Sequence, residues 1–275
     1  HVSRQLMPRW NLLSSDAKDI YWVFNGNVAR RAPGFDWTKP VPGWTSETEW
    51  GPFIPFEQYP QLFNPLSGFL QNCNNPPWVA TRNSGLRPLD PVPYFLKAAP
   101  RADAGEEALN TRGERLFQAL GGDRKFTLEE MIDVGFDTYI LAADVIVPLL
   151  ERATRSTTDA RIAGAMERIR RWDRRSGVDS VAYTYIYFWG KAYRQLYARR
   201  FGRFVSSSRK TIDLDSPEEQ KMALAAFGQA LDRMQKLFGK TEVRWGEVTV
   251  VVRGGAFPMD GEPLYGVLHP DEGVE

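Results

Sequence analysis

The chain has 275 residues, of which 43% are hydrophobic, so it can bury a substantial core and intrinsic disorder is excluded. Its 35 Lys and Arg residues nearly balance its 34 Asp and Glu residues, and the net charge of +1 argues against nucleic acid as a main partner. The single cysteine, Cys73, and the two histidines, His1 and His269, exclude a disulfide framework, a zinc site built on several thiolates and a histidine-rich metal site.

Composition divides the chain into three predicted parts. Residues 1–104 hold 14 of the 19 prolines and six of the nine tryptophans, and because proline lacks a backbone donor, this part is predicted to be strands and loops. Residues 105–240 have helical periodicity, and residues 241–275 return to strand. The longest apolar stretch, 139–150, is broken by a carboxylate and a proline and is too short to cross a bilayer, so no membrane partner is expected.

The clearest predicted strand in the first part is Asp19–Phe24, which is rich in β-branched and aromatic side chains. Asn25-Gly26 follows it and is a strong turn signal, so we expect the chain to lead back through Val28. The helical part is predicted to begin with Glu106–Leu120. A second helix starts from a capping box at Thr127 and should kink or end at Pro148.

Further helices are predicted closer to the C-terminal end. Apolar residues at 162, 166 and 169 mark one helix, and an aromatic-rich helix runs over residues 180–200. A cap at Ser216 begins another, whose apolar stripe over residues 224–238 is typical of core packing. The alternation over Glu247–Arg253 then predicts a strand.

The densest polar cluster, residues 64–78, contains four asparagines, a glutamine and a cysteine. Asparagine amides can stabilise a developing oxyanion in acyl transfer, but Asn and Pro also favour turns, and composition alone favours the turn interpretation. Cys73 would need exposure and a nearby base to act as a nucleophile, so an inert buried thiol is the favoured interpretation. Arg112 lies near the start of a predicted helix, where a cation opposes the macrodipole, which weakly indicates a specific partner.

Several short motifs are spread along the chain. They are Asp16-Ala17-Lys18-Asp19-Ile20-Tyr21-Trp22, Pro42-Gly43-Trp44, Asn64-Pro65, Ser67-Gly68-Phe69, Asn72-Cys73-Asn74-Asn75, Arg112-Gly113-Glu114-Arg115-Leu116, Arg171-Trp172-Asp173 and Trp245-Gly246-Glu247. The ordered set covers nearly the whole chain. The chain resembles the penicillin acylase family and, within it, the aculeacin and acyl-homoserine-lactone acylase branch.

This resemblance implies an N-terminal-nucleophile (Ntn) hydrolase of α+β class, an αββα sandwich in which residues 105–240 are a helical insertion. The family hydrolyses linear amide bonds with the N-terminal Ser, Cys or Thr of a self-cleaved β-chain, whose α-amino group acts as the base. By motif, Asn74 is expected to supply the oxyanion-hole amide, and Arg112 is expected to position both that amide and the amine of the nucleophile. A periplasmic or secreted protein is implied, and no cofactor is assigned. Some members bind calcium through a proline carbonyl where this chain has Val28, so no metal is assigned either.

The implied substrate is a small-molecule N-acyl amide, so an apolar acyl pocket is expected. Aromatic residues around the motifs are the candidates to border it, and they are Trp50, Phe53, Phe56, Phe69 and Trp78. Plain core packing explains each of these aromatic residues equally well.

The chain departs from the family pattern at its start, where His1 stands instead of a nucleophile. We therefore expect it to be the middle part of a β-chain, inactive alone, with the remainder of the acylase (the α-chain and the β-chain N-terminal part) as its partner. The alternative is a non-catalytic module of this fold that binds an acyl ligand or serves a structural role. The many tryptophans suggest, as a third hypothesis, a sugar-processing enzyme that uses paired carboxylates, although no carboxylate spacing demands one.

Overall fold

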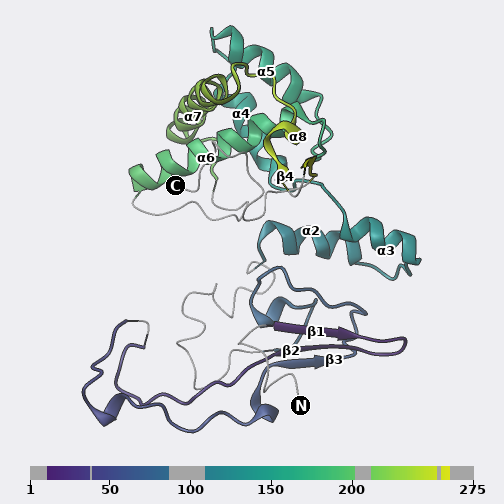
Figure 1. Ribbon diagram of the computed structural model, residues 1–275, viewed down its shortest axis with the longest axis vertical. Coiled ribbons are helices and arrows are strands. Elements are labelled where there is room, and N and C mark those ends of the chain that lie inside the picture. Colours follow the sequence, from purple (N-terminus) through teal and green to yellow (C-terminus); the bar gives the residue numbers. More distant parts are fainter. Residues whose placement is uncertain (1–10, 38, 87–108, 202–211, 253–254, 261–275) are drawn as a thin grey trace. The chain divides into compact units, whose positions relative to one another are not determined.

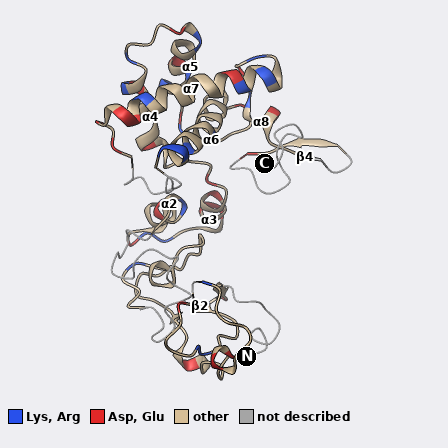
Figure 2. Ribbon diagram, turned by 90° about the vertical axis from the view of Figure 1, so that its left-hand side faces the viewer, with Lys and Arg blue, Asp and Glu red and all other residues tan. Residues whose placement is uncertain are grey.

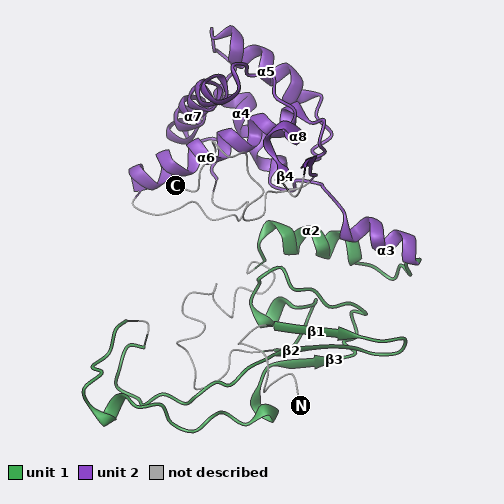
Figure 3. Ribbon diagram, viewed as in Figure 1, with its two compact units in different colours: residues 1–127 green, residues 128–275 purple. Residues whose placement is uncertain are grey.

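The computed structural model describes residues 11–37, 39–86, 109–201, 212–252 and 255–260. The chain divides into two compact units, residues 1–127 and residues 128–275 (Figure 3). The predicted boundary between residues 104 and 105 lies outside the described residues. Among the described residues, unit 1 holds a small sheet and one α-helix, whereas unit 2 is mainly helical (Figure 1). The α+β class that the sequence predicts is therefore confirmed.

The sheet of unit 1 is antiparallel, with strand order β1-β2-β3. The strands are β1 (Asn11–Ser15), β2 (Ile20–Phe24) and β3 (Gln61–Phe63). A tight turn joins β1 to β2, because the carboxylate of Asp16 accepts hydrogen bonds from the backbone N–H groups of Lys18 and Asp19 at 2.8 and 2.9 Å. These bonds stabilise the charged carboxylate and lower the pKa of Asp16.

The predicted strand at 19–24 is confirmed, but the predicted hairpin after it is wrong. Both edges of β2 are already paired, with β1 on one side and β3 on the other. The chain therefore bends at Gly26, whose φ is +113°, and runs on to a separate bridge between Ala29 and Phe53. The backbone N–H of Ile54 donates to the Val28 carbonyl at 2.8 Å in the same place.

The other described parts of unit 1 are loops, three short 3₁₀ helices and α2 (Thr111–Leu120). The 3₁₀ helices are η1 (Ser46–Thr48), η2 (Phe56–Gln58) and η3 (Pro77–Val79). Apolar side chains of η3 pack against α2, because Trp78 and Val79 share a buried cluster with Leu109 and Phe117. This cluster holds the loop before η3 close to the beginning of α2.

Unit 2 contains six helices and a two-stranded antiparallel sheet among its described residues. The elements are α3 (Leu128–Gly135), α4 (Ala143–Ala153), α5 (Ala160–Arg170), α6 (Val181–Phe201), α7 (Pro217–Phe238), α8 (Trp245–Val248), β4 (Val250–Val252) and β5 (Ala256–Pro258). Helices α6 and α7 form the centre of its core, where aromatic residues of α6 meet the apolar stripe of α7. No helix among the described residues has the length and apolar character needed to cross a membrane.

The predicted limits of α7 are confirmed by its caps. The Ser216 side chain accepts the Glu219 N–H at 3.3 Å, and Gly239 ends the helix in the left-handed conformation with φ of +69°. Basic and acidic residues both occur along α5 and α7 (Figure 2). The scattered arginine pairs fit this pattern, as in the contact of Arg170 with Glu167 at 3.2 Å on one face of α5.

Two predictions in unit 2 are wrong. The helix that starts at Thr127 is predicted to kink or end at Pro148, but Pro148 lies inside the next helix, α4, where Val147, Leu149 and Leu150 are buried and tertiary packing outweighs the lost hydrogen bond. The break occurs instead after Gly135, where α3 ends.

The strand predicted over Glu247–Arg253 begins late, because residues 245–248 form the short helix α8. The first residue of α8, Trp245, is fully buried between the rings of Tyr183 and Tyr187, at centroid distances of 4.6 and 4.9 Å. Backbone hydrogen bonds from Trp245 to the Ser180 carbonyl and from Gly246 to the Val178 carbonyl fix this turn at 3.2 and 2.7 Å.

Replacement of Trp245 with Ala should therefore lower the free energy of unfolding by about 3–5 kcal/mol, because it leaves a cavity in the core of unit 2. Urea unfolding monitored by circular dichroism measures this change. The control is Phe136→Ala, since Phe136 is 81% exposed and its loss should change stability by less than about 0.5 kcal/mol. Equal effects of the two substitutions would contradict the assigned packing.

Candidate functional site

The polar loop 71–75 is hydrogen-bonded to the beginning of α2 through Asn110. The Asn110 Oδ1 atom caps the helix by accepting the Gly113 N–H at 3.0 Å, and its Nδ2 atom donates to the Cys73 carbonyl oxygen at 2.7 Å. The backbone N–H of Asn110 donates to Asn75 Oδ1 at 2.9 Å. One residue thus joins the loop and the helix by three hydrogen bonds.

The other side of the loop is held by the buried side chain of Gln71. Its Nε2 atom donates to the Val79 carbonyl at 2.6 Å, and its Oε1 atom accepts the Cys73 N–H at 2.9 Å. The Gln71 backbone N–H donates to the Ala80 carbonyl at 2.8 Å. The loop is therefore fixed between η3 and α2, although its outer residues are exposed.

Asn74 lies at the exposed tip of this loop with a left-handed φ of +58°. Its Oδ1 atom accepts a hydrogen bond from Nη2 of Arg112 at 2.9 Å. Since a guanidinium group only donates, the amide atom that faces it must be the oxygen, and the amide NH₂ therefore points away from Arg112. No described residue accepts a hydrogen bond from this NH₂ group.

Arg112 has a second acceptor, because the same Nη2 atom lies 3.0 Å from the Cys73 carbonyl oxygen. These two contacts explain why a cation occupies the first turn of α2, where the helix macrodipole is unfavourable to it. The structure thus brings together Asn74 and Arg112, the two residues that the resemblance marks as catalytic. Their catalytic roles remain proposals.

Gly113 lets α2 come close enough to the loop for these contacts. A Cβ atom at this position would lie 2.3 Å from Nδ2 of Asn75 and 2.8 Å from Cδ2 of Leu109. Sequence analysis did not single out Gly113, Asn110 or Asn75 as site residues. The available signal was Asn110 itself, an N-cap residue type directly before the helix.

The Cys73 thiol does not have the environment of a nucleophile. The residue is half-buried, and this burial raises the pKa of the Cys73 thiol, while the charge of Arg112 opposes the change to a smaller extent. The thiol is therefore protonated near neutral pH. The backbone carbonyl of Cys73, rather than its side chain, takes part in the site.

The five aromatic candidates for an acyl pocket lie in different environments. Trp78 is buried and shares its cluster with Phe69, whose ring meets that of Phe117 edge-on at a centroid distance of 5.4 Å. Phe56 packs against Val28, Ile54 and Tyr59 in another cluster. Trp50 and Phe53 are 65% and 57% exposed, and the Arg31 guanidinium lies 3.9 Å from the centroid of the Trp50 ring. The structure does not gather the five side chains into one pocket.

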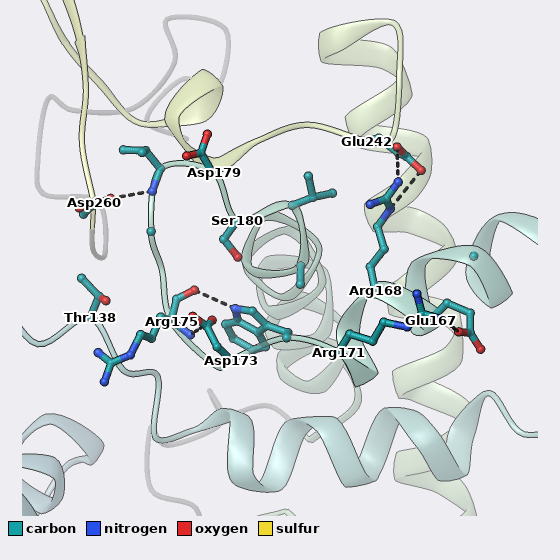
Figure 4. Close-up of a pocket in the computed structure, with 16 residues that line it drawn as sticks. Thr138, Glu167, Arg168, Arg171, Asp173, Arg175, Asp179, Ser180, Glu242 and Asp260 are labelled. Atoms are coloured by element: carbon teal, nitrogen blue, oxygen red, sulfur yellow. Dashed lines mark hydrogen bonds and ion pairs between the residues drawn. The ribbon is translucent and has the colours of Figure 1, made fainter.

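Unit 2 contains an open surface pocket of about 1050 Å³ between α5, the turn before α6 and the segment before α8 (Figure 4). Its charged groups are already paired within the protein. Arg168 contacts Glu242 at 2.6 Å, and the carboxylate of Asp260 accepts the Val178 N–H at 2.6 Å.

The one serine in the pocket lining also has a structural role. The Ser180 Oγ atom accepts the Tyr183 N–H at 3.1 Å and so caps α6. No histidine lies among the lining residues that could serve as its base. Among the lining residues that the structure describes, the pocket therefore has no serine paired with a histidine base. Within the described ranges of both units, no group of three or more His, Cys, Asp or Glu side chains is placed to hold a metal ion.

Comparisons with known proteins show which family this chain matches. The family model for penicillin amidase matches residues 1–266. Penicillin G acylase of Escherichia coli is 41% identical over 59 residues, which are 22% of this chain and 7% of that protein. The solved structure of a thermostable penicillin G acylase from Alcaligenes faecalis aligns with a TM-score of 0.52 at 17% identity, covering 83% of this chain and 47% of that one. The chain thus spans less than half of that solved structure, and this likeness concerns the fold.

Replacement of Gly113 with Ala should destabilise the protein by about 1–3 kcal/mol, because the new methyl group displaces Asn75 and separates the loop from α2. The matched control is Gly164→Ala in α5, where a Cβ atom would meet nothing within 4 Å. That change should stabilise the helix by about 0.5–1 kcal/mol. Thermal or urea unfolding of the two variants gives the comparison, and a stabilising Gly113→Ala would contradict the close contact.

Proposed function

Because the chain belongs to the penicillin amidase family, we propose that it is part of an N-acyl amide hydrolase in which Asn74 stabilises the oxyanion. The observation that supports this proposal most directly is the Asn74 amide, which Arg112 orients at 2.9 Å so that its NH₂ group is exposed. An amide donor in a fixed position matches what acyl transfer requires.

The proposed reaction begins when a nucleophile attacks the carbonyl carbon of the substrate amide. The electron pair of the C=O bond moves to oxygen, and the Asn74 NH₂ group donates a hydrogen bond to this negative oxygen. The intermediate then collapses, the protonated amine leaves, and water hydrolyses the acyl-enzyme to the acid. Asn74 contributes because its contact is stronger with the oxyanion than with the neutral carbonyl.

We assign the nucleophile to an N-terminal Ser, Cys or Thr of a companion chain, whose α-amino group would act as the base. Cys73 is next to Asn74 in sequence, but burial raises the pKa of its thiol, so it does not supply a thiolate. The family resemblance supports the companion chain, together with self-cleavage of a precursor and export to the periplasm or secretion. The 275-residue chain alone is then expected to be inactive.

The proposed substrate is an N-acyl amide of the penicillin or acyl-homoserine-lactone type. Trp50 and Phe53 have exposed rings that could border an apolar acyl group, although the Arg31 guanidinium covers part of the Trp50 ring. Phe56, Phe69 and Trp78 pack into the two apolar clusters of unit 1. They would therefore support the wall of the proposed pocket and would not line it with their whole rings.

Replacement of Asn74 with Ala in the hydrolytically active protein should lower kcat for amide hydrolysis by roughly 10²–10³, the cost of one lost oxyanion donor. The matched control is Asn83→Ala. Asn83 is also an exposed asparagine of unit 1 with a left-handed φ, here +49°, so the two substitutions share their backbone cost. An unchanged kcat in Asn74→Ala would remove the assigned role.

The companion chain is tested by intact mass measurement and N-terminal sequencing of every polypeptide in an active preparation. We expect a second chain that begins with Ser, Cys or Thr, and we expect hydrolysis to require it. Hydrolysis by the 275-residue chain alone, freed of every other polypeptide, would mean that the nucleophile lies within this chain.

A further inference from the structure

We infer that Asn110 is a positioning residue for the Asn74 amide and that it acts through the Cys73 carbonyl oxygen. This inference rests on the proposed role of Asn74 and extends it to a residue that does not touch the substrate. It follows from three sets of contacts: those of the peptide unit that precedes Asn74, those of Arg112 and those of Asn110.

The peptide unit between Cys73 and Asn74 is held at both of its polar atoms. Its carbonyl oxygen accepts hydrogen bonds from Nδ2 of Asn110 at 2.7 Å and from Nη2 of Arg112 at 3.0 Å. Its N–H donates to Oδ1 of Asn72 at 3.2 Å. Because the peptide unit is planar, fixing both atoms fixes the plane from which the Asn74 side chain departs.

The backbone of Asn74 needs this restraint. Its φ of +58° lies in the left-handed region, which L-residues other than glycine adopt only rarely and asparagine tolerates best. A freed peptide plane would rotate toward the commoner conformations and would carry the Asn74 amide away from its position. The bond from Asn110 opposes this rotation.

Arg112 alone is a weaker restraint. Its guanidinium is exposed and lies at the end of a long, flexible side chain. One nitrogen atom, Nη2, donates to both the Cys73 carbonyl oxygen and Asn74 Oδ1. Asn110 has a short side chain that is half-buried, and its Oδ1 atom and backbone N–H are both engaged, with Gly113 and Asn75 respectively. The Nδ2 atom of Asn110 is therefore the stiffer of the two donors to the Cys73 carbonyl.

The two ends of the Asn110 side chain have separable tasks, and the substitution Asn110→Asp separates them. Aspartate keeps the size and the cap acceptor for the Gly113 N–H, and it caps helices about as well as asparagine. It loses the donor and places an oxygen against the Cys73 carbonyl oxygen. We expect an unchanged or higher Tm, a kcat lowered by up to about a hundredfold, and a KM that changes much less.

A second variant, Asn110→Ser, controls for the added negative charge near Arg112. Serine also caps the helix, but its shorter side chain cannot reach the Cys73 carbonyl. Asn110→Ser should lower kcat, as Asn110→Asp does, without introducing a negative charge. If both variants lose stability, and kcat falls only as far as the loss of folded protein explains, the inference is overturned. Asn110 would then have a merely structural role.

The double variant Asn74→Ala/Asn110→Asp tests whether Asn110 acts through Asn74. Once the Asn74 amide is absent, loss of the Asn110 donor should lower kcat no further, so the two effects should not multiply. Fully multiplicative losses would overturn the inference. If Asn74→Ala alone leaves kcat unchanged, the proposed function fails. If Asn74→Ala lowers kcat but both Asn110 variants retain normal kcat, only the positioning role fails.

Discussion

The geometry of the site depends on one peptide carbonyl, that of Cys73. Two donors from the first turn of α2 and its cap converge on this oxygen, at 2.7 and 3.0 Å. A carbonyl oxygen has two lone pairs, so both are used and the oxygen has no need of water. The tip of the loop is exposed while Gln71 and Asn75 are buried, and this oxygen is a point at which the beginning of α2 restrains the backbone next to Asn74. Gly113 keeps the helix close enough for the contact.

There is a chemical reason to pair a cation, Arg112, with a neutral amide, Asn74. A cation placed directly at the reacting oxygen would also bind other anions, including the acid product, strongly. Here the cation lies behind the amide and contacts its oxygen at 2.9 Å, while the NH₂ group faces outward. Hydrogen bonds in series polarise one another, so the charge of Arg112 would strengthen the proposed donor without touching the substrate.

The sequence predicts the local elements of this fold better than its long-range contacts. The helices α5, α6 and α7 follow from apolar periodicity and from caps such as Ser216 and Gly239, which act within a few residues. The hairpin expected after β2 is wrong, because the pairing partners of β2 are chosen by the whole sheet and not by the turn signal at Asn25-Gly26. Pro148 inside α4 shows the same effect, since buried neighbours outweigh a local helix breaker.

In the candidate site, too, local patterns are predicted better than long-range contacts. Asn74 and Arg112 were proposed from the ordered motifs, but Asn110 and Asn75, which lie 35 residues apart, meet in a contact that no local pattern encodes. The acyl-pocket aromatics were chosen by residue type alone, and type does not decide whether Trp78 is buried or Trp50 exposed.

The contrast between the two units indicates where chemistry is to be sought. In the unit 2 pocket, Arg168 and Asp260 have partners within the protein, so a ligand would have to compete with existing bonds. At the tip of loop 71–75, the donor of Asn74 is ordered by its neighbours, yet no described residue accepts from it. The Asn74 side chain is exposed, so water can accept from this donor until a ligand replaces it. We propose that this ligand is the oxygen of a bound carbonyl that develops negative charge, because a neutral amide NH₂ group held in place suits such an oxygen.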